Sequence, residues 1–112
     1  VATITPVVNA GAVTTSRAPI IDVAADKVAK VNSLIIANVD GTNAADITVE
    51  VSIDNGSSYV AIAKTVSVAA DSSLIVVGKD NGFYLDETDL LLVTASAASD
   101  LTYLVSYELM TD

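Results

Sequence analysis

The densest group of side chains that could do chemistry is the acidic run Asp86-Glu87-Thr88-Asp89. Calcium takes about six to eight oxygen ligands in a folded loop, and this run could supply some of them, but the EF-hand spacing is absent. Paired carboxylates could also act as the acid and base of a glycosidase, which needs a sugar cleft. The sequence has no Trp to line such a cleft. We therefore interpret the run as a solvated turn and predict neither a metal site nor catalysis there.

Two further segments, "VDGTNAAD" and "SIDNGSS", place Asp close to Gly, as some cation-binding loops do. Asp and Asn hydrogen-bond the backbone of tight turns and Gly permits the bend, so turn formation explains both segments. The sequence Asn55-Gly56-Ser57 matches a glycosylation acceptor, but it also coincides with one of these turns. We predict structural turns at both places.

Nucleophilic catalysis has few possible components in this chain. It contains no His and no Cys, which excludes Ser-His and Cys-His triads, disulfides and thiolate metal sites. The serine pairs Ser57-Ser58 and Ser72-Ser73 would need Lys64 or Lys79 as a base, and nothing in the sequence indicates that either lysine is buried. No glycine-rich phosphate loop occurs. We predict a protein that is not an enzyme and binds no cofactor.

The charge balance argues against two classes of partner. The chain has 14 acidic residues against 5 basic ones and a net charge of −9. An acidic surface repels phosphate backbones and anionic lipids, so we expect no direct binding to nucleic acid or membranes. No apolar run reaches ten residues, so the sequence predicts neither a transmembrane helix nor a signal peptide.

The elements around these candidate residues follow a period of two. In "DITVEVSIDNGSSYVAIAK", Ile47, Val49, Val51 and Ile53 alternate with polar residues, which predicts a strand with one buried face. Asn55-Gly56 then favours a tight turn, and Val60 and Ile62 lie on one face of the second arm. This segment predicts a β-hairpin. In "VAKVNSLIIANV", the inner part "LIIA" is apolar on both faces, as in a strand that is covered on two sides.

Similar short segments recur along the chain and are separated by turn residues about every 8–12 positions. We predict seven to eight short strands and an all-β fold, a single antiparallel β-sandwich with Ig-like or jelly-roll-like topology. The later strands are expected at 74–77, 83–85, 90–97 and 101–109. No crossover helices are available for an α/β fold.

Residues 1–19 are predicted to form an extended N-terminal arm, and residues 20–112 the sandwich domain. The arm is either a loosely ordered lead-in or a strand that pairs with a neighbouring subunit, because exposed strand edges attract partners. Tyrosines combine apolar area with one polar group, which suits either the core or a contact with another protein. The residues predicted to bind partners are Thr3, Ile4, Val7, Val8, Tyr59 and Tyr84.

Five short segments of the chain form a distinctive set. They are an Asn-Val-Asp-Gly-Thr loop, an "AKT" strand, an Ala-Asp-Ser-Ser step, a Tyr-Leu plus acidic turn and a closing "VSYE" strand. They lie at Asn38 to Thr42, Ala63 to Thr65, Ala70 to Ser73, Tyr84 to Asp89 and Val105 to Glu108. Together they resemble a family of small structural proteins of tailed bacteriophages. The resemblance covers Ser33 to Met110 and leaves the first thirty residues uncovered.

The resemblance implies a virion component with no catalytic residues. A capsid decoration (cement) protein is the role we favour, located on the capsid exterior or in the head–tail region. It would bind other virion proteins, chiefly the major capsid protein, and associate as a homo-oligomer. A neck or collar component and a tail- or fibre-associated protein with a receptor- or carbohydrate-binding role remain alternatives. So do a calcium-dependent hydrolase and an Ig-like adhesion repeat.

Overall fold

Alternating aliphatic residues form strands at nine places within residues 3–111, the part of the chain that the computed structural model describes. The strands are β1 (Thr3–Ala12), β2 (Ala18–Asp22), β3 (Lys27–Asn38), β4 (Ala45–Ser52), β5 (Val60–Val68), β6 (Ser73–Val77), β7 (Phe83–Leu85), β8 (Leu90–Ala95) and β9 (Leu101–Thr111). Within this range no segment forms a helix of the length and apolarity that crossing a bilayer requires.

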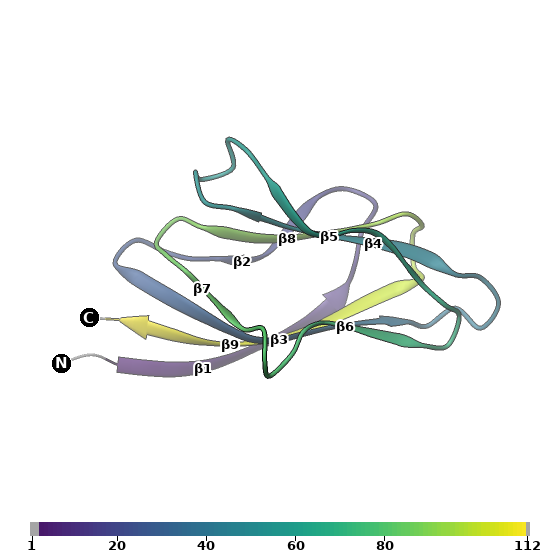
Figure 1. The fold of residues 1–112 in the computed structure, drawn as a ribbon, viewed down its shortest axis with the longest axis horizontal. Helices are drawn as coiled ribbons and strands as arrows, with labels where there is room; N and C mark the ends of the chain where they lie inside the picture. The colour runs from purple at the N-terminus through teal and green to yellow at the C-terminus, as the bar shows by residue number, and fades with distance from the viewer. Residues whose placement is uncertain (1–2, 112) are drawn as a thin grey trace.

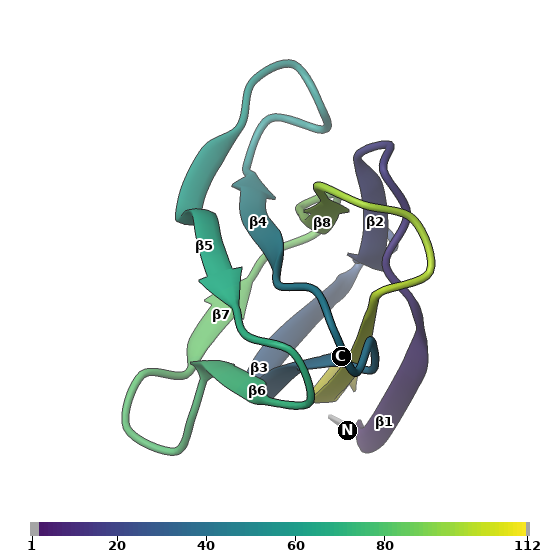
Figure 2. The ribbon, with the colours of Figure 1, turned by 90° about the vertical axis from the view of Figure 1, so that its right-hand side faces the viewer.

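The strands form two antiparallel sheets that lie face to face (Figures 1 and 2). The five-stranded sheet has the order β1-β9-β3-β6, with β7 also paired to β3, and the four-stranded sheet has the order β2-β8-β4-β5. The predicted antiparallel β-sandwich is confirmed. Apart from the short β7, the chain crosses between the sheets after most strands, in the order of a jelly roll rather than an Ig domain.

Aliphatic side chains fill the space between the sheets, as the alternating pattern requires. In β3, Leu34 and Ile36 are fully buried, whereas Ile35 and Ala37 lie on the opposite surface and are only half-buried. The pattern "LIIA" predicts cover on both faces of this strand. Within residues 3–111 only the inner face is covered, because no other part of the described chain packs over the outer one.

The predicted hairpin forms from β4 and β5, and the chain reverses at Asn55 and Gly56, whose φ angles are 56° and 89°. The prediction that Ile53 continues the buried face is wrong, because β4 ends at Ser52 and Ile53 is 73% exposed. On the second arm, Val60 and Ile62 also remain exposed.

The predicted arm contains a complete strand. Residues 1 and 2 lie outside the described residues, and Thr3–Ala12 forms β1, which pairs with β9 of its own chain over its whole length. This strand brings the total to nine, where seven to eight were predicted. Contact of the arm with a neighbouring subunit stays a prediction.

Candidate interaction surface

The acidic run Asp86–Asp89 uses its carboxylates to hold its own turn. Asp89 is buried, and its Oδ2 accepts a hydrogen bond from the Asp86 N–H at 2.8 Å. Asp86 Oδ1 accepts from the Glu87 N–H at 2.8 Å, and the Glu87 carboxylate accepts from the Asp26 N–H at 2.9 Å. Within residues 3–111, no group of three or more His, Cys, Asp or Glu residues is placed to hold a metal ion.

The loop that follows β3 is built in the same way. Asn38 is buried, and its Nδ2 donates to the carbonyls of Asn43 at 3.0 Å and Val68 at 2.9 Å. Its Oδ1 accepts from the Asp40 N–H at 2.9 Å. The backbone N–H groups of Thr42 and Asn43 donate to Asp40 and lower the pKa of that carboxyl. The Asn-Val-Asp-Gly-Thr motif is therefore a self-bonded loop.

Two segments that carry the family resemblance, Asn38 to Thr42 and Ala70 to Ser73, meet beside this loop. The Asn38 N–H donates to the Ser72 carbonyl at 2.8 Å, and the Asp71 N–H donates to the Asp40 carbonyl at 3.2 Å. Asp100 lies against the same loop, where desolvation and then the neighbouring Asp40 raise the pKa of its carboxyl. These motif residues therefore stabilise loops by bonding one another.

Two of the serines considered as nucleophiles, Ser58 and Ser72, hold turns through their hydrogen bonds. The Ser58 hydroxyl and N–H donate to the Asp54 carboxylate and lower its pKa, and the Ser52 hydroxyl donates to the same group at 3.0 Å. The Ser72 hydroxyl donates to the Ala69 carbonyl at 2.6 Å. These bonds give Ser52, Ser58 and Ser72 a structural role.

One side of the five-stranded sheet presents an apolar surface to solvent. Leu101 and Val105 of β9 are fully buried, so the alternate residues of β9 point away from the core. Residues directly opposite one another in a sheet point to the same face, so the strand register identifies the rest of this surface. We call it the open face: Ile4, Pro6, Val8, Ala10, Ala12, Val28, Lys30, Ser33, Ile35, Ala37, Ser73, Ile75, Tyr84, Thr102, Leu104, Ser106, Glu108 and Met110.

The open face is almost free of charge in a chain whose net charge is −9. Lys30 and Glu108 are its charged residues, and they are direct partners in the strand register. Its large side chains are well exposed, Ile75 being 66% exposed and Leu104 43%. Contiguous exposed apolar surface is typical of interaction sites, so the open face is the candidate interaction surface.

The outer face of the four-stranded sheet, which we call the covered face, is closed by the chain itself around Leu92 and Ser52. Leu92 of β8 pairs with Glu50 and so points away from the core, yet it is only 4% exposed. Ser52 is on the same face and is fully buried, because its hydroxyl lies under the β4–β5 loop and accepts from the Gly56 N–H at 2.8 Å. That loop rises from the sheet at the top of Figures 1 and 2.

Arg17 fixes this cover from the β1–β2 connection. Its Nε and Nη2 donate to the two carboxylate oxygens of Glu50 at 2.8 and 3.2 Å. Its guanidinium also stacks over the Tyr59 ring, 3.8 Å from the ring centroid. The bond to Glu50 raises the pKa of Arg17 further above its usual value. Two loops distant in sequence thus meet over one sheet.

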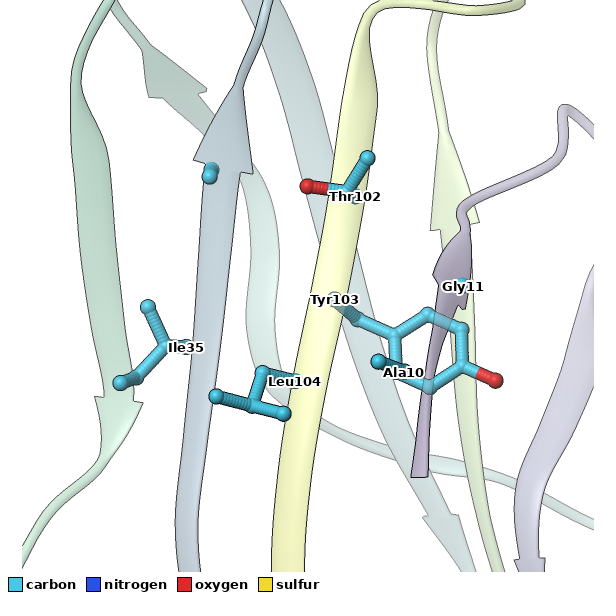
Figure 3. Close-up of a pocket in the computed structure, with 7 residues that line it drawn as sticks. Ala10, Gly11, Ile35, Thr102, Tyr103 and Leu104 are labelled. Carbon is cyan, nitrogen blue, oxygen red and sulfur yellow. The ribbon is translucent and has the colours of Figure 1, made fainter. Parts of the chain in front are cut away.

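A hollow of about 490 Å³ lies on the open face, near the end where the loops of Asn38 and Asp100 are found. Figure 3 shows Ile35 and Leu104 projecting from β3 and β9, with Ala10 and Gly11 on β1 beside them. Small side chains make the space. A Cβ at Gly11 would lie 3.3 Å from the Tyr103 ring, so Gly11 leaves room for that ring. The lining residues are Ala10, Gly11, Ile35, Ala37, Thr102, Tyr103 and Leu104.

The structure separates the residues predicted to bind partners. Ile4, Val8 and Tyr84 lie on the open face, whereas Thr3 and Val7 point to the other side of β1. Tyr59 lies in the β4–β5 loop of the opposite sheet, with its ring under the Arg17 guanidinium. Whether any of the six binds a partner stays a prediction.

The sequence reasoning missed Ile75 and Leu104, which share a row of the open face with Ile35 and Ala10. The "LIIA" pattern was the signal for this row, because it marked the outer side of β3 as apolar. The prediction from sequence also missed a second apolar region, a groove of about 290 Å³ between the β4–β5 hairpin and β7. The groove is lined by Val51, Ile53, Val60, Ile62 and Phe83.

No protein-family model matches the sequence, and no curated protein matches it. Solved structures share the fold. A chain from Bacillus endospore appendages, which form disulfide-linked pili, aligns with a TM-score of 0.56 at 17% identity, covering 98% of this chain and 87% of the other.

A chain of the infectious bursal disease virus particle aligns with a TM-score of 0.57 at 6% identity, covering 98% of this chain and 31% of the viral one. A pentameric capsid protein from metagenomic phage sequences aligns with a TM-score of 0.44 at 15% identity, over 90% of this chain and 59% of the other. The first two likenesses show a common sandwich fold.

Proposed function

We propose that this chain is a non-enzymatic structural protein of a bacteriophage virion. More specifically, it is a capsid decoration protein that stabilises the head by binding the lattice of the major capsid protein. The resemblance of Ser33 to Met110 to small phage structural proteins supports the virion. The sandwich fold, which a viral particle chain and a pilus subunit share, is compatible with assembly into large arrays.

The observation that carries the attachment to the shell is the free edge of β1. Among the described residues this strand pairs only with β9, and it runs ten residues without a register shift and contains no charged residue. Nine of those ten residues are exposed. An exposed edge of this kind offers backbone groups to a strand from another protein.

The other sheet edges have features that discourage such pairing. β5 has two register shifts against β4, the charged Lys64 and a left-handed residue, Thr65, with φ 46°. β2 and β6 have five residues each, and β7 has three. Bulges, charges and short strands are the usual protections of an edge. β1 is therefore the edge that a capsid subunit would use.

Many copies of this contact would act together. Each copy adds a strand to a neighbouring shell subunit, and weak contacts repeated over a lattice sum to a stable clamp. The net charge of −9 opposes nonspecific aggregation of the protein before assembly. The neck, collar and tail positions would use the same edge, and a map of the intact particle distinguishes them from the head.

The test is binding of the purified chain to phage particles that lack it, measured by co-sedimentation and by the melting temperature of the particles. We expect saturable binding and a higher melting temperature. Particles that bind none of the wild-type chain would overturn the proposed function.

A proline on β1 tests the edge itself. An edge strand tolerates proline where the backbone nitrogen points away from the neighbouring strand. The nitrogen of Pro6 therefore points to the free side of β1, and the N–H of Val8, two residues on, points to the same side. Val8→Pro should lower particle occupancy while the isolated chain stays folded. Val7→Pro is the matched control, because it removes a donor from the ladder with β9 and should lower the Tm of the chain instead. Full occupancy with Val8→Pro would remove the edge from the mechanism.

A further inference from the structure

The open face has complementary features at its two ends. At one end, Ile4, Met110 and Val28 form a row of large side chains across β1, β9 and β3. At the other end is the hollow of about 490 Å³ around Ala10 and Ala37. Ile4 and Ala10 belong to the same strand, so ridge and hollow are about 20 Å apart along it.

We propose that the open face packs against the open face of a second copy of this chain, with the ridge of each copy in the hollow of the other. A rotation of 180° about an axis in the interface and perpendicular to the strands produces this arrangement. It reverses the strand direction and so brings each ridge over the partner's hollow. Such a contact is isologous and closes at two copies.

The distribution of charge lets a second copy occupy the open face. Two chains of net charge −9 repel each other over most of their surfaces. The open face carries one positive and one negative residue, Lys30 and Glu108, side by side in the register. Two such faces can therefore meet without adding like charges to the contact, and each Lys30 has a carboxylate beside it when water is excluded.

The size of the face fits a stable dimer. Eleven residues of β9 at about 3.3 Å each and four strands about 4.8 Å apart give a face of about 700 Å² in projection. Stable protein interfaces bury about 800 Å² per partner. The sequence of β3 agrees with this, because "LIIA" has the pattern of a strand covered on both sides and the described chain covers only one.

The dimer deepens the proposed function and rests on it for its role, since the decoration protein would reach the shell as a pair with both β1 edges available. Its existence is tested on the purified chain alone. Analytical ultracentrifugation should give a particle of twice the 11.4 kDa chain mass. A wild-type chain that stays monomeric at the highest soluble concentration would overturn the dimer, and particle binding by that monomer would leave the proposed function intact.

Two lysine substitutions at equal exposure locate the interface. Leu104 is 43% exposed on the open face, and Ile62 is 44% exposed in the groove beside β5. Leu104→Lys should raise the dimer Kd by about 30-fold or more, because it introduces a charge into the apolar hollow that receives the partner's ridge. Ile62→Lys should leave the Kd unchanged. An intact dimer with Leu104→Lys, or dissociation by Ile62→Lys alone, would contradict the proposed interface.

A substitution that fills the hollow distinguishes a shape-complementary interface from nonspecific apolar association. Ala10→Leu adds apolar surface but occupies the space that the ridge needs, so we expect a weaker dimer. Ile4→Ala should weaken it as well by shortening the ridge. A tighter dimer with Ala10→Leu would refute the ridge-in-hollow fit. A monomeric chain in which Leu104→Lys abolishes particle binding would assign the open face to the shell protein and overturn the dimer.

Discussion

The covered face and the open face each carry a leucine in the second strand of their sheet, and the surroundings of the two leucines differ. Leu92 on β8 lies beside Glu50, which Arg17 binds, and it is almost inaccessible to water. Leu104 on β9 lies beside a hollow and remains exposed. The jelly roll uses its long β4–β5 loop to complete the first face and leaves the second without a cover from the described chain.

The same difference appears in the polar groups. On the covered face, the Ser52 hydroxyl is bonded to the loop above it, and an ion pair and a cation–π contact lie over the strands. On the open face, Lys30 and Glu108 are the charged residues. A face that the chain covers contributes to its own stability, whereas an uncovered apolar face is available for association, as we propose for the open face. Substitutions at equivalent places should therefore affect folding on one face and assembly on the other.

The largest expected difference is between the two leucines. Leu92→Ala should destabilise the chain by about 2–4 kcal/mol, because it removes buried methyl groups under a cover that cannot fully collapse. Leu104→Ala should cost less than about 1 kcal/mol at concentrations where the chain is monomeric. Urea denaturation of both variants measures the two values. Equal losses would mean that the two faces do not differ in cover.

A serine pair gives the next largest effect. Ser52→Ala leaves the Gly56 N–H without its partner under the loop, which should cost about 1–3 kcal/mol. Ser106→Ala on the open face should leave the free energy of unfolding nearly unchanged. Thermal melts followed by circular dichroism compare them. A neutral Ser52→Ala would show that the loop does not depend on this anchor.

Substitution of Arg17 tests its contacts with Glu50 and Tyr59 over the covered face, and we expect a smaller effect on stability. Arg17→Ala should lower the Tm slightly and expose Tyr59 to solvent, because the guanidinium no longer lies over the ring. Arg17→Lys keeps the charge but cannot bind both oxygens of Glu50 in a fork, so it should restore only part of the Tm. Acrylamide quenching of tyrosine fluorescence reports the exposure of Tyr59. No change in quenching with Arg17→Ala would contradict the stacking of Arg17 over the Tyr59 ring.

The smallest effect concerns pH. The hydrogen bonds from Ser58 and Ser52 hold the pKa of Asp54 below its ordinary value of 3.8. A depressed folded-state pKa contributes stability above the unfolded pKa and loses it as pH falls through the folded one. The Tm advantage of the wild type over Asp54→Asn should therefore be constant near neutral pH and shrink below about pH 4. A difference that persists unchanged to pH 2 would exclude the carboxylate as its source.

Local patterns predicted much of the fold. The strand Phe83–Leu85 has the predicted bounds, and the Asn55-Gly56 reversal occurs where turn chemistry placed it. In contrast, Ile53 follows the alternation but lies beyond the end of β4, so the pattern alone assigned it to the wrong environment. The pairing of β1 with β9 joins the two ends of the described chain, and no local pattern specifies a partner so distant.

The candidate surface was only partly predictable for the same reason. Ile4, Val8 and Tyr84 were chosen because their types suit contacts, and their common face depends on registers between four different strands. Tyr59 has the same chemistry, but it belongs to the other sheet's loop, where Arg17, 42 positions earlier in the sequence, packs over its ring and leaves it 37% exposed. Exposure is a property of what packs over a residue, which the residue type does not encode.

The sequence by itself determined that the chain forms short strands, that its turns occur at Asn and Gly, and that its surface is acidic, because these depend on side-chain period, backbone freedom and charge. Only the tertiary structure decided which sheet face the chain covers and which it leaves open. That outcome depends on where a loop between two strands comes to rest, and the free energy of packing over a face involves residues from several distant segments at once.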